Sequence, residues 1–341
     1  MLGLPLRMST PDPSVILTRV TRSGEVESLH RGVVVVTRDD AVIHAWGDVD
    51  QPVFVRSAAK PFQMLPFFER GLADRYGITT AETAILIASH SGTPEHVAVV
   101  RSLMARIGVN ESELLCGPHA PYDHQASIAI ARAGDKPLPV HSNCSGKHAG
   151  FMRLAREHEC DVARYLDPLA PSQLEVRRAV QEMTSTRDDE IFVGIDGCGA
   201  PTFRMPLVAL ARGFGRLATP SMCPPKRVAA VRGMLSAISS FPHIFSGHGR
   251  LEEALINAMP GRIFPKNGAE GVYAIGLPGT GLGIAIKVSD GSDRGYQPVV
   301  IELLRRLDVL PEIPLALERF RRPPVMNTQK LVVGHVENLL P

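Results

Sequence analysis

A serine and a lysine stand three residues apart in Ser57-Ala58-Ala59-Lys60. Residues at this spacing share one face of a helix, so the amine of Lys60 can reach the hydroxyl of Ser57. An amine that is kept neutral can take the hydroxyl proton and make the serine a nucleophile for acyl transfer. The motif alone is common, and a helix cap followed by a surface lysine explains most of its occurrences. Partners elsewhere in the chain must therefore decide whether it marks an active site.

A second lysine motif, Lys266-Asn267-Gly268, lies just before a predicted strand at 271–275. A Lys-x-Gly tripeptide on a sheet edge is the third element of the serine acyl-transfer pattern that opens with Ser-x-x-Lys. A further polar serine, Ser89, lies between the two motifs in the sequence. Each motif is weak alone, but their order and separation favour a serine acyl-transfer site.

Two cysteines form another group that could do chemistry: Cys144, followed by Lys147, and Cys198. Thiolates bind zinc, but the spacing shows no Cys₄ or Cys₂His₂ set. The neighbouring His141 and His148 could complete one, although histidines beside glycine turns are more often hydrogen-bonding loop residues. A papain-like nucleophile at Cys144 is a further alternative, and the spacing does not decide among these possibilities.

The bulk composition describes an ordinary soluble globular chain of 341 residues, 44% hydrophobic and 21% charged. The 37 basic residues nearly balance the 35 acidic ones, so no strong field favours nucleic acid or an anionic membrane surface. No apolar run approaches the roughly 18 residues of a spanning helix, and the first residues lack the order of a signal peptide. We expect no nucleic-acid or membrane partner and a cytoplasmic location. Five cysteines, an odd number, fit free thiols or a metal site.

Strand patterns lie towards both ends of the chain and helical patterns in its middle. Strands are predicted at 13–22, 33–36, 41–46, 193–195, 271–275, 283–288 and 330–336, and helices from 57, 80 and 94, then at 172–184, 224–240 and 298–307. Pro61 predicts an irregular start to the helix that follows Ser57. The glycine-rich run 276–283 lacks the Gly-Lys-Ser/Thr ending of a phosphate loop and favours a hairpin.

This order predicts an α+β fold, with an antiparallel sheet assembled from both chain ends, helices packed on it and a mostly helical middle region. We expect one catalytic unit over 13–341, with its sheet region at about 13–60 and 240–341 and its helical region at about 61–239. Residues 1–12 are expected to be an N-terminal extension.

The motifs together resemble the class 3, rhizobial-type L-asparaginase family, which is similar in fold to serine β-lactamases and serine-dependent glutaminases. The similarity runs from about residue 13 to the C-terminus. The motifs that carry it are Arg56-Ser57-Ala58-Ala59-Lys60-Pro61-Phe62-Gln63, Ser89-His90-Ser91-Gly92-Thr93, Cys116-Gly117-Pro118-His119, Asn143-Cys144-Ser145-Gly146-Lys147-His148-Ala149-Gly150 and Asp196-Gly197-Cys198-Gly199-Ala200-Pro201.

The resemblance implies hydrolysis of L-asparagine to L-aspartate and ammonia through a serine acyl-enzyme. It also implies two Ser-Lys tandems, Ser57 with Lys60 and Ser89 with Lys266. Ser57 is expected to be the nucleophile and Lys60 its base. Ser89, poised by Lys266, is expected to pass a proton to the departing ammonia.

The resemblance further implies a homodimer, and a zinc ion held by Cys144, Cys198 and Lys147. This zinc is expected to tune substrate affinity rather than to activate the amide. By charge, Arg56 and Asp196 are suited to the α-carboxylate and α-ammonium of the substrate. Asn143 is a further candidate for substrate binding, and a loop-shaping role suits it equally well.

Two other functions stay open on the sequence. One is a serine-dependent glutaminase, a β-lactam-binding hydrolase or a related amidase, since these share Ser-x-x-Lys and Lys-x-Gly. The absence of a following Ser-x-Asn triad and of an export signal speaks against β-lactam binding. The other is a protein that binds zinc or an amino acid through the Cys144 and Cys198 pair without turnover.

Overall fold

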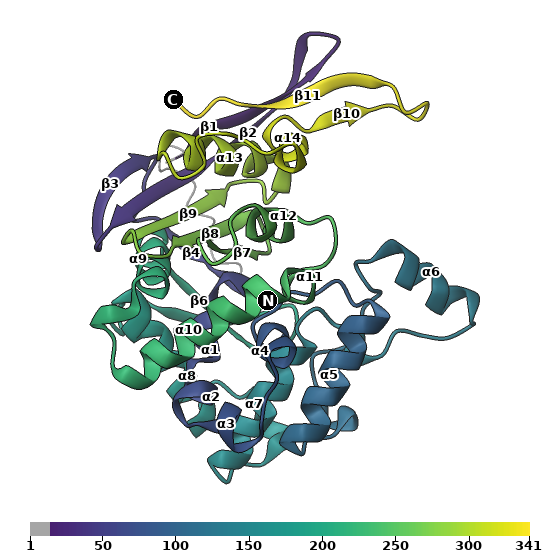
Figure 1. The fold of residues 1–341 in the computed structure, drawn as a ribbon, viewed down its shortest axis with the longest axis vertical. Helices are drawn as coiled ribbons and strands as arrows, with labels where there is room; N and C mark the ends of the chain where they lie inside the picture. Colours follow the sequence, from purple (N-terminus) through teal and green to yellow (C-terminus); the bar gives the residue numbers. More distant parts are fainter. Residues whose placement is uncertain (1–13) are drawn as a thin grey trace, which may run out of the picture.

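The structure of the chain is a computed structural model that describes residues 14–341. The extension expected over residues 1–12 lies outside the described residues. The described part consists of a large antiparallel sheet at one end and a mostly helical region at the other (Figure 1). Within it, no helix is long and apolar enough to cross a membrane.

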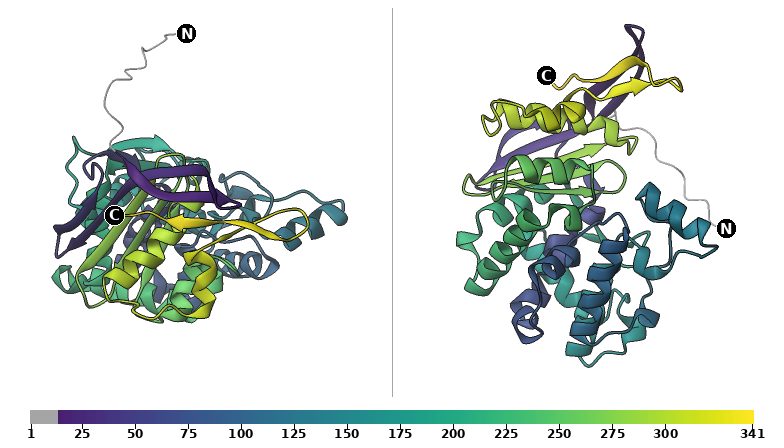
Figure 2. Two further views of the ribbon diagram at one scale, coloured as in Figure 1. Left: turned by 90° about the horizontal axis from the view of Figure 1, so that it is seen from above. Right: turned by 45° about the vertical axis from the view of Figure 1, so that its right-hand side comes forward.

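Strands from both chain ends form an eight-stranded antiparallel sheet. The strand order is β10-β11-β1-β2-β9-β8-β7, and β3 pairs with β2. Figure 2 shows the first and last strands lying side by side at one edge. The expected α+β architecture is therefore confirmed. The strands are β1 (Val15–Arg22), β2 (Glu25–Arg38), β3 (Ala41–Trp46), β7 (Phe264–Gly268), β8 (Val272–Leu277), β9 (Leu282–Val288), β10 (Pro324–Met326) and β11 (Val332–Asn338).

The described residues also form a second, three-stranded sheet. Its order is β4-β6-β5, with β4 at Pro52–Phe54, β6 at Pro201–Pro206 and β5 at Phe192–Ile195. The sequence analysis predicts β5 but not β6. Because β4 leads directly into Ser57, this small sheet fixes where the first motif begins.

Most helices lie between β4 and β7, as expected. They are α1 (Lys60–Gln63), α2 (Leu65–Glu69), α3 (Leu72–Arg75), α4 (Thr80–Leu86), α5 (Pro94–Ile107), α6 (His124–Arg132), α7 (Ser145–Glu157), α8 (Pro171–Thr184), α9 (Leu207–Ala218), α10 (Pro225–Ser240), α11 (Pro242–Phe245) and α12 (Leu251–Ala258). Two more, α13 (Gln297–Arg306) and α14 (Leu315–Arg321), precede the last strands.

The local starts of these helices follow the sequence closely. Thr79 and Thr93 cap α4 and α5, each accepting a hydrogen bond from the backbone N–H three residues on. The helix after Ser57 begins irregularly, as Pro61 predicts: a 3₁₀ turn (Arg56–Ala59) precedes α1, which ends after four residues.

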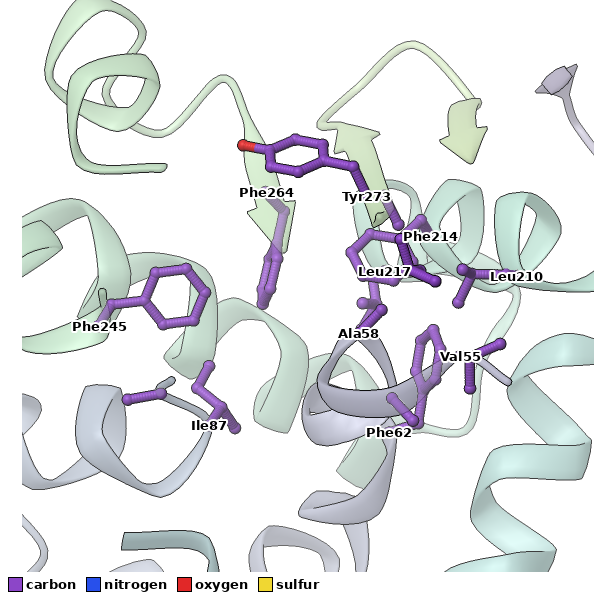
Figure 3. Close-up of a cluster of buried hydrophobic side chains, with 14 of the residues drawn as sticks. Val55, Ala58, Phe62, Ile87, Leu210, Phe214, Leu217, Phe245, Phe264 and Tyr273 are labelled. Carbon is purple, nitrogen blue, oxygen red and sulfur yellow. The ribbon is translucent and has the colours of Figure 1, made fainter. Parts of the chain in front are cut away.

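Helix α9, which the sequence analysis missed, packs directly on the large sheet. A β-carbon added at Gly283 of β9 would lie 1.9 Å from the carbonyl oxygen of Ala211, so only glycine permits this approach. Phe214 of α9 then stacks edge-on against Phe62 and against Phe264 (Figure 3). This buried cluster ties α1, β7 and α9 together and holds the two lysine motifs in a fixed relation.

Candidate active site

Two buried lysines meet at a single hydroxyl group. The Nζ atom of Lys60, at the start of α1, lies 3.0 Å from Oγ of Ser89. The Nζ atom of Lys266, in β7, lies 2.8 Å from the same oxygen. Lys60 is 0% and Lys266 1% exposed, so bulk water reaches neither amine. The fold thus joins three motifs that are far apart in the sequence.

This arrangement favours neutral amines. Burial lowers the pKa of Lys60. Burial, and then the charge of Lys60, lower the pKa of Lys266 well below its ordinary value. Two ammonium groups within 3.0 Å of one oxygen would repel each other strongly in this dry setting. At least one lysine is therefore suited to exchange a proton with Ser89.

The other contacts of the two amines fix their positions. Lys60 also donates to the carbonyl oxygens of Ala88, at 2.5 Å, and Asn143, at 3.2 Å. Lys266 donates to the carbonyl and the side-chain oxygen of Asn267, both at 2.9 Å. The sequence analysis places Lys266 before a strand, whereas the structure places it inside β7, beside β8. Its side chain is therefore held by a sheet.

Ser57 is placed differently from Ser89. Its side chain is partly exposed, and its hydroxyl forms no hydrogen bond with another described residue. Lys60, its expected partner, turns its amine to Ser89 instead. The preceding Arg56 has φ of +50°, a left-handed conformation that costs a non-glycine residue energy. Ser57 is thus presented on a strained turn, with its hydroxyl free to meet a ligand.

Two cavities meet at Ser57. We call the larger, of about 530 Å³, the Ser89 chamber, because Ser57 and Ser89 both line it. The smaller, of about 320 Å³, contains Cys144 and Cys198, and we call it the thiol chamber. Ser57, Tyr122, Asn143 and Ala269 line both chambers. A ligand attacked at Ser57 could therefore extend into either one.

The buried Lys147 lies beside the two cysteines of the thiol chamber but does not line the cavity itself. Nζ of Lys147 lies 3.5 Å from Sγ of Cys198, and Sγ of Cys144 lies 3.3 Å from Oδ1 of Asn143. A hydrogen bond from Cys198 lowers the pKa of Cys144, and the same bond raises that of Cys198. Burial acts to lower the pKa of Lys147, but the two cysteines and Asp196 together raise it. These directions favour the charged form of Lys147 beside the two sulfur atoms.

These residues fit a zinc ion chemically, since thiolates are preferred zinc ligands and a lysine amine can donate once it is deprotonated. Among residues 14–341, no three His, Cys, Asp or Glu side chains are grouped as a metal site. The expected set contains only two residues of these types, because its third member is a lysine.

Arg56 and Asp196 form a close ion pair on the wall of the thiol chamber. Nη2 of Arg56 lies 2.7 Å and Nε 2.8 Å from Oδ1 of Asp196, which also accepts the backbone N–H of Gly197. Burial would raise the pKa of Asp196, but Lys147 and Arg56 hold it below its ordinary value. All these bonds use Oδ1, which leaves Oδ2 of Asp196 available to a ligand.

Sequence reasoning missed several residues of the site. Arg250, Glu252, Asp293 and Tyr296 line the Ser89 chamber, far from Ser57 in the sequence. The glycine-rich run 246–250, which carries the arginine, was the one available signal, since such polar loops often build sites. His119, in the Cys116-Gly117-Pro118-His119 motif, supports the site by accepting the backbone N–H of Asn143 at 3.0 Å.

Comparison with known proteins gives family and structural likenesses. Among curated proteins, none matches this chain. A β-lactamase from Mycobacterium bovis shares 15% identity, with 81% of this chain and 94% of the other covered and a TM-score of 0.41. A putative β-lactamase from Bacteroides dorei shares 13% identity (81% and 92% covered, TM-score 0.43). A probable glutaminase from Bacillus subtilis shares 14% (81% and 83% covered, TM-score 0.37).

The sequence profile of the family described as L-asparaginase II matches residues 18–338, which is nearly the whole chain. That range includes both lysines at Ser89, the free hydroxyl of Ser57 and the two cysteines. The resemblance found in the motifs is thereby confirmed, and it supports an amidohydrolase activity. The chain belongs to the L-asparaginase II family.

Proposed function

We propose that this protein hydrolyses L-asparagine to L-aspartate and ammonia through a serine acyl-enzyme. One observation carries the proposal: two buried lysines hold the hydroxyl of Ser89 in a cavity that also contains the free hydroxyl of Ser57. A nucleophile beside a proton relay is the arrangement that acyl transfer from an amide needs.

In the proposed first step, Oγ of Ser57 attacks the side-chain amide carbon of asparagine, and Lys60 takes the hydroxyl proton. The amine of Lys60 contacts Ser89 in the free protein, so this step needs Lys60 or Ser57 to change its side-chain conformation. Catalytic hydrogen bonds are often long or misaligned before substrate binds. Burial, which lowers the pKa of Lys60, and the strained turn at Arg56 support this role.

Loss of ammonia requires a proton at the amide nitrogen. Ser89 can donate its hydroxyl proton there and recover one from Lys60 or Lys266, since both amines contact its oxygen. Water then attacks the ester at Ser57, and the same groups return the protons. This division of labour places the leaving nitrogen on the Ser89 side of Ser57.

The amino-acid head of the substrate would then occupy the thiol chamber. Arg56 keeps guanidinium donors beyond those used on Asp196, and these can bind the α-carboxylate. The free Oδ2 of Asp196 can accept the α-ammonium. Asn143 lines both chambers and could contact the substrate where they meet. The ion pair of Arg56 with Asp196 would thus orient the zwitterionic head of the substrate without leaving a buried charge unpaired.

Ammonia release from purified protein tests the proposal. We expect kcat/KM for L-asparagine to exceed that for L-glutamine by about 10-fold or more, because one added methylene displaces the amide from Ser57. Equal values would make this a general amidase or a glutaminase. No ammonia from either amide, with an amino acid bound, would instead favour the binding protein without turnover.

We propose that Cys144, Cys198 and Lys147 hold a zinc ion that tunes affinity for the amino-acid head. When bound, the metal would neutralise the thiolate charge beside Asp196 and take part in no bond-breaking step. Because Lys147 must lose its proton to bind, and its pKa is raised, zinc affinity should fall as the pH falls.

Replacing Cys198 with alanine is expected to abolish stoichiometric zinc, as measured by elemental analysis after dialysis against zinc. Cys160→Ala is the matched control, since that cysteine lies outside both chambers. An unchanged zinc content in Cys198→Ala would refute the ligand set, and loss of zinc in both variants would indicate a general folding defect.

A homodimer and a cytoplasmic location stay predictions from the sequence. The β4-β6-β5 sheet supports an interface, because β5 is an edge strand and its Phe192 is 59% exposed. We expect light scattering to give a dimer mass that Phe192→Glu shifts towards the monomer. Leu315→Glu, at an exposed leucine of α14, should leave the mass unchanged.

A further inference from the structure

The Ser89 chamber is much larger than the leaving group of an asparaginase requires. Ammonia is about the size of a water molecule, whose share of liquid volume is about 30 Å³. The chamber measures about 530 Å³ and extends from Ser57 and Ser89 to residues 248–252 and to Tyr296. If the amide nitrogen faces Ser89, as the proposed function requires, a substituent on that nitrogen would have room to bind.

The far wall contains a carboxylate without a hydrogen-bond partner. Glu252, at the start of α12, is 2% exposed, and no described residue donates a hydrogen bond to it. Its nearest charged neighbour is Nε of Arg250, at 3.6 Å, which is longer than a hydrogen bond. A buried carboxylate in this state is stabilised by any donor that enters the chamber, and most by a cation.

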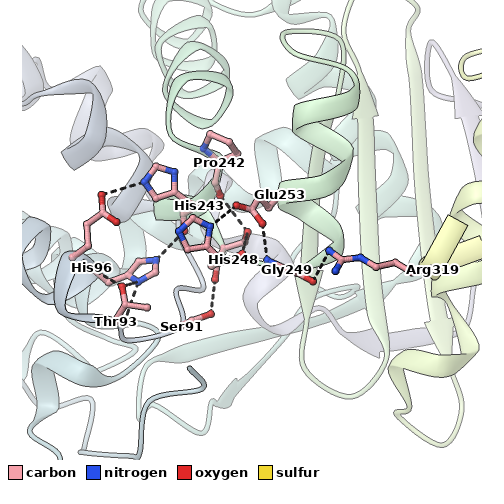
Figure 4. Close-up of polar contacts among 12 residues, drawn as sticks. Ser91, Thr93, His96, Pro242, His243, His248, Gly249, Glu253 and Arg319 are labelled. Carbon is pink, nitrogen blue, oxygen red and sulfur yellow. Dashed lines mark hydrogen bonds and ion pairs between the residues drawn. The ribbon is translucent and has the colours of Figure 1, made fainter. Parts of the chain in front are cut away.

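The loop that carries Arg250 is held in place from several sides (Figure 4). Gly249 donates its N–H to Glu253, at 2.6 Å, and accepts a hydrogen bond from Arg319, at 3.2 Å. His248 contacts the other oxygen of Glu253, at 2.8 Å, and Ser91 donates to the carbonyl of Ser246. The wall is therefore formed before a ligand arrives, so binding there costs little ordering entropy.

The charges that line the chamber favour a cation. Asp123, Glu252 and Asp293 are acidic, and Arg250 alone among the described lining residues carries a fixed positive charge. One oxygen of Asp123 caps α6 by accepting the backbone N–H of Ala126, and no described residue donates a hydrogen bond to the other oxygen. Burial raises the pKa of Asp293, and a bound cation would favour its ionised form.

We propose that the Ser89 chamber binds a positively charged substituent on the amide nitrogen, so that the protein hydrolyses N4-substituted asparagines whose substituent ends in an ammonium group. The inference rests on the proposed function for the position of the reacting bond. The chemistry is unchanged: the Ser57 oxygen–carbon bond forms, the carbon–nitrogen bond breaks, and Ser89 protonates the departing primary amine. Water then releases L-aspartate, and the diamine leaves through the chamber.

Three substrates test this inference: L-asparagine, N4-(4-aminobutyl)-L-asparagine and N4-pentyl-L-asparagine, in which a methyl group replaces the ammonium. Aspartate release is measured for each by chromatography. We expect both substituted amides to be hydrolysed, and kcat/KM for the aminobutyl compound to exceed that for the pentyl compound by about 10-fold or more, as for recognition by a buried polar group. Failure of both substituted amides while asparagine turns over would overturn the inference.

Variants then assign the preference to the wall of the chamber. Glu252→Gln should reduce the ratio between the aminobutyl and pentyl compounds towards one, and Asp293→Asn should reduce it in part. Glu318→Gln, at a carboxylate on α14 that pairs with Arg321, should keep the wild-type ratio. If Glu252→Gln does not fold, Asp293→Asn provides the test. An unchanged ratio between the aminobutyl and pentyl compounds in Asp293→Asn would refute recognition of the cation by the acidic wall.

The outcomes separate the inference from the proposed function. If asparagine is inert but the aminobutyl compound is hydrolysed, the asparaginase proposal is wrong and the chamber inference stands. If asparagine alone is hydrolysed, the asparaginase proposal stands and the chamber inference is wrong. If no amide is hydrolysed, both are wrong.

Discussion

Replacing Ser57 with alanine is expected to lower kcat for L-asparagine by at least about 1,000-fold, because no acyl-enzyme can then form. Replacing Ser89 should also be costly, by roughly 100- to 10,000-fold, since it removes the proton relay to the leaving nitrogen. Rates alone do not separate the two roles, because residues that act as one unit give non-additive losses. The serine that carries the acyl group must therefore be identified directly.

Treatment with a reactive diazo-ketone analogue of asparagine, followed by peptide mass spectrometry, identifies the serine that becomes labelled. The label should appear on Ser57 in the wild type and in Ser89→Ala, and should be absent from Ser57→Ala. Ser91→Ala is the control: its hydroxyl lines the same chamber but donates to Ser246 and contacts neither lysine. Label on Ser89 in the wild type would reverse the assignment, an outcome with a physical basis, because Ser89 is the serine that both lysines contact.

The architecture was predictable because its signals are local. Thr79 and Thr93 have the sequence pattern of helix caps, and Pro61 forces an irregular helix start whatever surrounds it. Helix α9 was missed although Leu207, Leu210, Phe214 and Leu217 recur at helical spacing, because Gly213 and Gly215 interrupt the pattern. Gly283 marks the close approach of α9 to the sheet only once the partner is known.

The site was predictable in its residue types but not in its contacts. The motifs indicate which lysines and serines belong together, yet the spacing of Ser57 and Lys60 suggests a contact that the free protein does not form. Lys60 bends to Ser89 because the turn at Arg56 and the carbonyls of Ala88 and Asn143 direct its amine there. Such pairings across the fold, like that of Lys266 with Ser89, depend on tertiary packing that periodicity does not encode.

Replacing Lys266 with methionine is expected to abolish asparagine hydrolysis and also to change how stability depends on pH. The unfolded chain binds a proton at this lysine below a pKa of about 10.4. In the folded protein, burial and Lys60 lower the pKa well below that value, so the folded state gives up the proton first as the pH rises. The contribution of Lys266 to the free energy of unfolding therefore rises with pH, up to the pKa that this lysine has in the unfolded chain.

Each pH unit over which only the unfolded state is protonated changes the free energy of unfolding by about 1.4 kcal/mol. Lys266→Met removes the free-energy cost of keeping this lysine deprotonated in the folded state. It also leaves Asn267 without its hydrogen-bond donor, which costs about 1 kcal/mol. Near neutral pH the first effect should win, so the variant should unfold at higher temperature than the wild type. The difference should shrink as the pH approaches 10.

Thermal unfolding followed by circular dichroism between pH 6 and 10 measures this dependence, with Lys136→Met, at an exposed lysine, as the control that should parallel the wild type. A Lys266→Met curve parallel to the wild type would mean that Lys266 is charged in the folded state. It would then be a poor proton acceptor for Ser89, and Lys60 alone would have to carry the relay. An inactive variant that is more stable at neutral pH would instead show that the protein gives up stability to keep this amine neutral, which is the cost expected of a catalytic base.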